Sequence, residues 1–341
     1  MLRRTFLATS AAAAAVAQQR KNSVRFGIDL FSVRSSGYTA FQHLDLAAKH
    51  NAKVVHFSEI RFMGSLDSGH LKQVREHADR LGIEIEMGMR SVCPTSKSFD
   101  AAQGSAEQQL LRMLDAAKTT GSPIVRAFLG TMADRTGSLP IDAHIENTAK
   151  VLRAVRAQFR DANKKIAIEN HAGDLQAREL KTLIEESGKD VVGACIDSGN
   201  PVWALEDPHL TLETLHPYIL TSHVRDSLLW RTPEGIAVRW TRMGEGNVDI
   251  AGWVRKYREL CPGRALSMEI IVTGPRNYAV LDPKFWEGYK TTPAWEFSRF
   301  LAIAEKGKPS SYTPAPKERA AEVEREDLAA SVRWTQELLS A

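Results

Sequence analysis

Short apolar runs alternate with amphipathic stretches along most of the chain. Each amphipathic stretch carries apolar residues at the 3.6-residue period of a helix, and the runs between them are typical of buried strands. The runs occupy residues 24–31, 53–60, 83–89, 123–130, 166–170, 191–197, 219–224 and 265–271. The pattern therefore predicts repeated strand–helix units joined in a parallel sheet.

Local signals indicate where several of the predicted helices begin. Thr39-x-x-Gln42 has the form of a capping box, in which two side chains satisfy free backbone N–H groups. Asp174 is placed to cap the helix that follows the fifth strand. Residues 294–306 carry the periodicity of the eighth helix.

Eight such units within about 280 residues favour the α/β class and a (β/α)8 barrel, a TIM barrel, with an additional C-terminal helix. A doubly wound open sheet is the alternative. That fold would usually place a G-x-G-x-x-G phosphate loop after its first strand, whereas "GIDLFSVRSSG" at 27–37 contains none.

The start of the chain does not belong to the predicted barrel. Residues 1–17 begin with positive charge, continue as an alanine-rich stretch and end in a small-x-small cleavage pattern. The pair Arg3-Arg4 resembles a twin-arginine signal, and an ordinary secretory signal is the alternative. We therefore expect an exported protein, periplasmic or secreted. The apolar stretch is too short for stable membrane insertion.

The remaining chain divides into three parts. Residues 24–305 form the predicted barrel, and residues 306–319 form a Pro/Ser-rich linker. Residues 320–341 form a terminal helix with an apolar stripe. We expect this helix to pack either on the outside of the barrel or on a partner chain. In the second case the protein would be a homo-oligomer.

Composition narrows the classes of partner. The apolar content of 43% and the charged content of 25% are ordinary for a globular protein of 341 residues. The net charge is +4, and it falls to +2 without residues 1–17, which hold two arginines and no acid. Because no cluster of Lys and Arg with interleaved aromatic residues occurs, we expect no nucleic-acid partner.

Polar residues end four successive predicted strands. They are Glu169, Asp197, His223 and Glu269. The C-terminal ends of the strands meet at one end of a TIM barrel, its mouth, and the active sites of this fold lie there. Three carboxylates and one imidazole suit one divalent ion, foremost Mn²⁺, with Mg²⁺, Co²⁺ or Zn²⁺ as alternatives. We also expect that carboxylates this close need a cation to stay ionised together.

The motifs around these residues resemble those of the sugar phosphate isomerase/epimerase family of xylose isomerase-like barrels. The resemblance covers about residues 24–305. It rests on "ENH" at 169–171, "DSGN" at 197–200, "HVRD" at 223–226, "GEGNVD" at 244–249 and "MEI" at 268–270. It implies that the four residues above hold one metal ion, and that Gly244 and Gly246 shape a turn.

The resemblance also implies a reaction on a keto-sugar or related polyol. Glu169 and Glu269 would be the catalytic pair, one removing the proton α to a carbonyl and the other returning it to the enediolate. Return on the opposite face gives epimerisation, and return at the next carbon gives isomerisation. Loss of a β-leaving group would instead give elimination.

Further polar and aromatic residues are candidate substrate contacts, although each type also has an ordinary structural use. Asn200 stands where some ketose epimerases of this superfamily carry a histidine, which leaves the sugar class open. The expected contacts are His171, Asn200, Arg225, Asp226, Glu59 and Trp230.

Three other functions compete with the isomerase. The first is a metal-dependent dehydratase or lyase acting on inosose-like polyols or 3-keto-glycosides, since these reactions begin with the same proton abstraction. The second is a nuclease for abasic DNA of the same superfamily, which would need extra histidines that the third strand end, Met89-Arg90-Ser91, does not supply. The third is a sugar-binding protein without catalysis.

Overall fold

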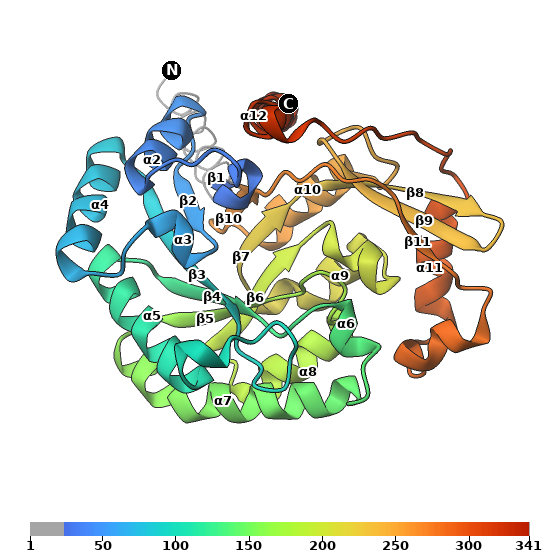
Figure 1. The fold of residues 1–341 in the computed structure, drawn as a ribbon, viewed down its shortest axis with the longest axis horizontal. Coiled ribbons are helices and arrows are strands. Elements are labelled where there is room, and N and C mark those ends of the chain that lie inside the picture. The colour runs from blue at the N-terminus through green and yellow to red at the C-terminus, as the bar shows by residue number, and fades with distance from the viewer. Residues whose placement is uncertain (1–23, 341) are drawn as a thin grey trace, which may run out of the picture.

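The computed structural model describes residues 24–340, in which eight parallel strands close into a barrel (Figure 1). The strands follow the chain order, and β10 closes the ring by pairing with β1 from Arg25↔Ala265 to Ile28↔Met268. They are β1 Arg25–Asp29, β2 Val54–Phe57, β3 Glu84–Ser91, β4 Ile124–Phe128, β5 Lys165–Glu169, β6 Val192–Asp197, β7 Ile219–Val224 and β10 Ala265–Met268. The predicted (β/α)8 barrel is confirmed.

Helices cover the outside of the barrel (Figure 1). The long ones are α2 Ala40–Lys49, α4 Ser68–Leu81, α5 Ala106–Thr120, α7 Ile141–Asp161, α8 Ala177–Ser187, α9 Pro208–Leu215 and α10 Ile250–Leu260. Short turns of helix lie in the connections: η1 Leu30–Val33, α3 Ile60–Met63, η2 Ala101–Gln103, α6 Met132–Arg135, η3 Asn200–Ala204 and η4 His216–Tyr218.

The two predicted helix caps have different outcomes. Thr39 and Gln42 form the expected capping box, in which each side chain bonds the other residue's backbone N–H. Asp174 is not a cap, because α8 begins three residues later with Gln176 as its cap. The Asp174 carboxylate is fully buried and accepts hydrogen bonds from the backbone amides of Gly130, His171 and Leu175. It therefore joins two loops at the barrel mouth.

A second sheet stands beside the barrel, at the right in Figure 1. Its strands are β8 Asp226–Thr232, β9 Gly235–Thr241 and β11 Arg276–Tyr278, paired antiparallel in the order β11-β9-β8. η5 Pro283–Tyr289 and α11 Ala294–Ala304 follow this sheet. Phe300 and Ala304 of α11 share an apolar cluster with Ile236 and Val238 of β9.

The eighth predicted helix forms, but it does not pack against the barrel strands as expected. Residues 294–306 were expected as the eighth barrel helix, but α11 covers the second sheet instead. The terminal helix α12 Ala320–Ser340, which follows η6 Lys317–Arg319, packs against η1 and β10. Its Leu328 and Val332 belong to the main apolar core. The chain thus covers the seam between β10 and β1 with its own last helix.

Two further points concern the predicted signal sequence and membrane-spanning helices. The predicted signal sequence, residues 1–17, lies outside the described residues. Among helices in the described part of the chain, none has the length and apolarity to cross a bilayer.

Candidate metal centre

The structure brings the four predicted metal ligands to one point at the C-terminal ends of neighbouring strands. Glu169 and Asp197 end β5 and β6, His223 is next to last in β7, and Glu269 directly follows β10. One ligand atom from each residue lies within 4.8 Å of the others. His223 Nδ1 lies 2.9 Å from an oxygen of Glu169 and 3.3 Å from an oxygen of Glu269. All four side chains are buried.

Two buried arginines balance most of the negative charge. Arg126, from the middle of β4, forms an ion pair with Glu169, and Arg225 binds both Asp197 and Glu269. Burial opposes ionisation of Glu169, but Arg126 and His223 outweigh it and hold the pKa of this carboxyl well below its ordinary value. Burial raises the pKa of Asp197 although Arg225 acts in the opposite direction, so the two arginines do not keep every carboxylate of the site equally ionised.

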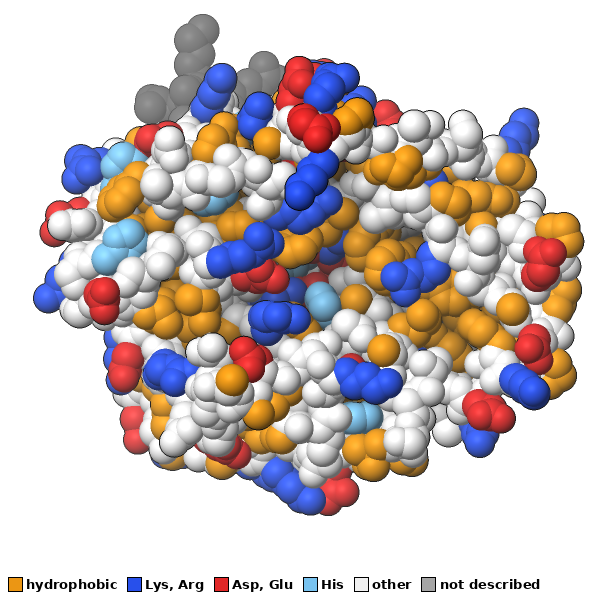
Figure 2. Space-filling model, in the orientation of Figure 1, with side chains coloured by type: hydrophobic (Ala, Val, Ile, Leu, Met, Phe, Trp, Pro, Cys, Tyr) orange, Lys and Arg blue, Asp and Glu red, His pale blue; other side chains and the backbone are white. Residues whose placement is uncertain are grey.

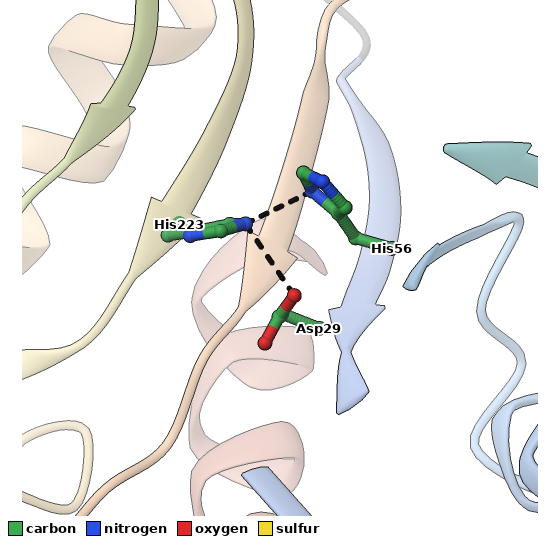
Figure 3. A group of neighbouring side chains, drawn as sticks. All are labelled: Asp29, His56 and His223. Atoms are coloured by element: carbon green, nitrogen blue, oxygen red, sulfur yellow. Dashed lines mark hydrogen bonds and ion pairs between the residues drawn. The ribbon is translucent and has the colours of Figure 1, made fainter. Parts of the chain in front are cut away.

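The floor below His223 is polar as well. His223 Nε2 lies 2.9 Å from His56 Nδ1 and 3.5 Å from Asp29 Oδ2 (Figure 3). Asp29 ends β1 and His56 lies in β2, so the imidazole of His223 is enclosed between them and the carboxylates above. Burial favours the neutral ring, yet the acidic groups around it, Cys195, Glu169 and Asp29, raise the pKa of His223 well above its ordinary value.

The sequence reasoning missed Asp29, His56 and Arg126. Each is a polar residue within or ending an otherwise apolar run, in "GID", "VVHF" and "IVRAF". Such a residue in a barrel strand must either face the interior or leave a buried charge unpaired. A polar residue in an otherwise apolar strand is therefore the signal that indicates all three residues.

Asn200 and the preceding backbone orient the carboxylates. The amides of Gly199 and Asn200 donate to Asp197 Oδ1 at 2.6 and 2.7 Å. The Asn200 side-chain nitrogen donates to Glu169 Oε1 at 3.1 Å. Asn200 is 2% exposed, and its side-chain oxygen has no hydrogen-bond partner among the described residues. Asn200, expected as a substrate contact, thus also supports Glu169 and Asp197, two of the four candidate metal ligands.

His171 lies beside the site with one ring nitrogen engaged. Its ring stacks on Phe128 with centroids 3.8 Å apart, and its Nδ1 lies 2.8 Å from the Gly130 carbonyl oxygen. Because a carbonyl can only accept, Nδ1 carries the proton. Burial lowers the pKa of His171 to about 4, so the ring is neutral and Nε2 remains an acceptor. This geometry suits the expected contact with a substrate hydroxyl.

Arg225 presents unused donors to the site. Its guanidinium lies 4.3 Å from the centroid of the Trp240 ring, and Trp240 stacks on Trp203 at 3.9 Å. Arg225 Nε and Nη1 are buried and have no hydrogen-bond partner among the described residues. Buried donors without partners are costly, so they mark a place where a ligand's oxygens would bind.

Three other expected substrate contacts have different partners in the structure. The Asp226 carboxylate accepts hydrogen bonds from the backbone amides of Ser227, Gly244 and Gly246, so it holds the turn after β9. Glu59 forms an ion pair with Arg61 in the loop after β2. Trp230 is buried in β8 opposite Ala237. Trp240, one strand later, is the tryptophan that contacts Arg225.

The donor set fits a divalent cation. Carboxylate oxygens and an imidazole nitrogen are ligands that Mn²⁺, Co²⁺ and Zn²⁺ accept. His223 Nδ1 is buried without a hydrogen-bond partner in the described structure, although it lies between two carboxylates. The ring is held on its other side by His56, which leaves Nδ1 directed at the shared point.

Comparison with known proteins defines the class. Residues 32–286 match the family described as xylose isomerase-like TIM barrel, which is most of the chain. This chain therefore belongs to the xylose isomerase-like TIM barrel family.

Two curated relatives match part of the chain. The uncharacterized protein YihM of Escherichia coli (strain K12) is 27% identical over 60% of this chain and 58% of its own length. The 3-oxo-isoapionate decarboxylase of Pectobacterium atrosepticum is 26% identical over 54% of this chain and 59% of its own length. The matches thus span under two thirds of these relatives.

A solved structure shares the fold. The D-psicose 3-epimerase of Clostridium cellulolyticum H10, solved with D-tagatose, superimposes with a TM-score of 0.56. It is 12% identical, and the match covers 89% of this chain and 99% of that one.

Proposed function

We propose that this protein is a divalent-metal-dependent isomerase or epimerase of a keto-sugar or related polyol. One observation carries the proposal: Glu169, Asp197, His223 and Glu269 direct four ligand atoms at one buried point at the mouth of the barrel. These four residues would hold the ion. A bound divalent ion would act there as a Lewis acid towards the carbonyl oxygen of the substrate.

The two glutamates supply the acid and the base. Glu169 and Glu269 approach His223 Nδ1 from β5 and β10, with Asp197 of β6 between them in the ring of strands. The low pKa of Glu169 keeps it ionised and able to accept the proton α to the carbonyl. Glu269, starting in its protonated form, then returns its proton to the other face or to the next carbon and is left ionised beside Arg225. Arg225 binds Glu269 and keeps it in place.

Hydrogen-bond donors and acceptors for the oxygens of a substrate lie around Glu169 and Glu269. The free N–H groups of Arg225 can bind hydroxyl or carbonyl oxygens, and the free Nε2 of His171 can accept from a hydroxyl. Trp240 and Trp203 form an aromatic wall beside them. Together these groups orient a polyol over the glutamates.

A metal-dependent lyase is the second candidate. The relative named 3-oxo-isoapionate decarboxylase favours it, because that name describes carbon–carbon cleavage next to a keto group of a sugar acid. Loss of carbon dioxide or water β to a carbonyl and proton abstraction α to it need the same stabilisation of negative charge on the carbonyl oxygen. The product of the reaction separates the two candidates.

Isotope exchange tests the proposed chemistry. The mature protein with added Mn²⁺ is incubated in ²H₂O with free ketoses, inososes and 3-keto-glycosides, and deuterium uptake is followed by NMR. We expect uptake by at least one substrate, its loss in Glu269→Gln, and no change in Glu259→Gln, an exposed glutamate on α10. If sugars bind without exchange, the protein is a sugar-binding module instead.

Export remains a separate proposal. It rests on Arg3-Arg4 and the alanine-rich segment of residues 1–17. We expect fractionation of the native host to place the protein outside the cytoplasm. The double substitution Arg3→Lys/Arg4→Lys, which keeps the charge but removes the arginine pair, is expected to retain the protein inside.

A further inference from the structure

The second sheet reaches the mouth of the barrel through Trp240. A hollow opens at the centre of the face shown in Figure 2, with acidic side chains at its floor and hydrophobic side chains along the side towards the second sheet. Trp240 is next to last in β9 and only 6% exposed. It contacts the segments that follow three barrel strands, at Gly199 after β6, Arg225 after β7 and Thr273 after β10.

Hydrogen bonds fix Trp240 to two of these segments. Its indole Nε1 donates to the carbonyl oxygen of Gly199 at 2.9 Å, and the amide of this glycine donates to Asp197 Oδ1 at 2.6 Å. The Trp240 amide donates to the Thr273 hydroxyl, and the Thr273 amide donates to the Trp240 carbonyl oxygen, both at 3.2 Å. Thr273 lies four residues after Glu269. Trp240 is thus bonded beside two of the candidate metal ligands.

Gly199 allows Trp240 and Arg225 to pack this closely. A Cβ added at Gly199 would clash with Cγ of Arg225 and would lie 3.1 Å from Nε1 of Trp240. Heavy atoms without a bond between them pack best at about 3.5–4.0 Å, so a side chain here would push the two residues apart.

The plane of the Arg225 guanidinium has few other constraints. Its Nη2 alone bonds Asp197 and Glu269, whereas Nε and Nη1 have no hydrogen-bond partner among residues 24–340. Hydrogen bonds at a single nitrogen lack the fixed geometry of a bidentate pair, so the planar group could still turn about Nη2. Cζ of Arg225 lies 4.3 Å from the Trp240 ring centroid, within the range of a cation–π contact. The indole face is therefore the contact that sets this plane.

Trp240 is itself supported by a second indole. Trp203 of η3 stacks on it with ring centroids 3.9 Å apart and planes only 3° from parallel. Cζ of Arg276, in β11, lies 3.8 Å from the Trp203 ring centroid. The four side chains form one continuous stack, which runs from the candidate metal centre to the second sheet, and this stack limits rotation of the Trp240 ring.

We infer that Trp240 is a positioning residue of the candidate metal centre. Its indole fixes the plane of Arg225, and Arg225 in turn holds Asp197 and Glu269 in place. This inference rests on the proposed function and extends its site to a residue of the second sheet. With its plane fixed, Arg225 also presents Nε and Nη1 to the oxygens of a substrate in one orientation.

Metal binding tests the inference, because lost packing alone would not change it. Titration calorimetry measures the Mn²⁺ affinity of the mature wild type, Trp240→Leu, Arg225→Gln and the double variant. Arg225 competes with a bound ion for Asp197 and Glu269, so we expect Arg225→Gln to bind Mn²⁺ more tightly. Trp240→Leu should shift the affinity in the same direction by about 5- to 30-fold, the range of a buried cation–π contact. The double variant should bind like Arg225→Gln alone, since no guanidinium is left to hold.

Two further variants separate the contributions to this effect. Trp240→Phe keeps an aromatic face for Arg225 and loses the hydrogen bond to Gly199, so we expect an affinity close to that of the wild type. Trp203→Leu removes the ring that supports Trp240. It should shift the affinity in the same direction as Trp240→Leu, by less, and it provides the test if Trp240→Leu does not fold.

Phe300→Leu is the control for looser packing of the second sheet. Phe300 of α11 is fully buried in the apolar cluster that contains Ile236 and Val238 of β9. We expect this variant to unfold at a lower urea concentration and to leave the Mn²⁺ affinity unchanged, in the wild type and in Arg225→Gln alike.

An unchanged Mn²⁺ affinity in folded Trp240→Leu and Trp203→Leu, or effects that add to that of Arg225→Gln, would overturn the inference. The proposed function fails separately. If the expected coupling appears but no sugar takes up deuterium, the isomerase chemistry is wrong and the role of Trp240 stands.

Urea unfolding in EDTA provides the same comparison without a metal ion. Arg225→Gln should lower the urea midpoint less in Trp240→Leu than in the wild type, because the two residues act together. Equal losses in both proteins would overturn the inference even for a protein that binds no Mn²⁺.

Discussion

His223 Nε2 and His56 Nδ1 lie 2.9 Å apart in the barrel interior, and both rings are fully buried. The contact occupies Nε2 of His223, so Nδ1 is the nitrogen that faces Glu169 and Glu269. Groups behind a metal-ligating histidine fix its tautomer and the direction of its ring. The His56–His223 contact thus orients the imidazole towards the point where we propose that a metal ion binds.

Replacing His56 should therefore weaken metal binding although His56 is not a ligand. We expect His56→Ala to lower the affinity for Mn²⁺ by about 10- to 100-fold, as for other partners of metal ligands. His56→Gln, whose side-chain oxygen can accept from His223, should lose less. Calorimetric titration with Mn²⁺ measures both. An unchanged affinity in a folded His56→Ala protein would show that the ring is oriented by other contacts.

Arg225 supplies a second prediction, because it pairs with Asp197 and Glu269 at once. Removing one partner from a buried ion pair costs about 3–5 kcal/mol. We expect Arg225→Gln to lose stability of that order in EDTA, and Mn²⁺ to stabilise this variant more than the wild type, since a cation offsets the missing charge. Denaturant unfolding with and without Mn²⁺ measures the difference.

The control for this experiment is Arg299→Gln. Arg299 pairs with Asp207 and Glu213 near the surface, where such contacts contribute about 0–1 kcal/mol. Equal stabilisation of Arg225→Gln and wild type by Mn²⁺ would mean that Arg225 and the ion do not act on the same carboxylates.

A substitution at Gly244 tests the structural role of the turn whose backbone amides bind Asp226. The Gly244 φ of +82° is unfavourable for other residues, and an added Cβ would lie 2.3 Å from the Trp334 ring nitrogen of α12. We expect Gly244→Ala to lower the free energy of unfolding by about 1–3 kcal/mol, as overpacking does. Gly69→Ala, where a Cβ meets no atom within 4 Å, is the control. A loss of Mn²⁺ affinity equal to that of His56→Ala would contradict a purely structural role.

Glu206 gives the protein a pH-dependent contribution to stability away from the metal centre. It is buried between the Ala177 amide and the Thr211 hydroxyl, and burial raises its pKa from 4.5 to about 7. The folded state therefore holds the proton more tightly than the unfolded state. This contribution is complete below about pH 4.5 and is lost as the pH rises towards 7.

Glu206→Gln removes this titration. Relative to wild type, the variant should gain about 3 kcal/mol of stability between pH 4.5 and pH 8, because a pKa shift of one unit corresponds to about 1.4 kcal/mol. Urea unfolding across this range measures it. Parallel stability curves for the two proteins would refute a titrating Glu206.

The strands and the barrel could be predicted because the period of apolar residues is a local property of the sequence. The regular alternation of strands with helices then favours a parallel barrel. The convergence of Glu169, Asp197, His223 and Glu269 followed because barrel geometry places strand ends together. The location of α11 did not, since an amphipathic helix shows that one face is covered but not what covers it. The role of Asp226 depends on backbone amides of a turn eighteen residues away, Gly244 among them, which no side-chain pattern reveals.

The ion itself is the most direct test. Elemental analysis of the purified mature protein, after growth with added manganese and removal of loose metal, counts the divalent ions bound per chain. We predict one ion in the wild type and none in the Glu169→Ala/Asp197→Ala double variant. A correctly folded wild type that takes up no divalent ion from Mn²⁺, Co²⁺, Zn²⁺ or Mg²⁺ would contradict the proposed metal centre and the chemistry built on it.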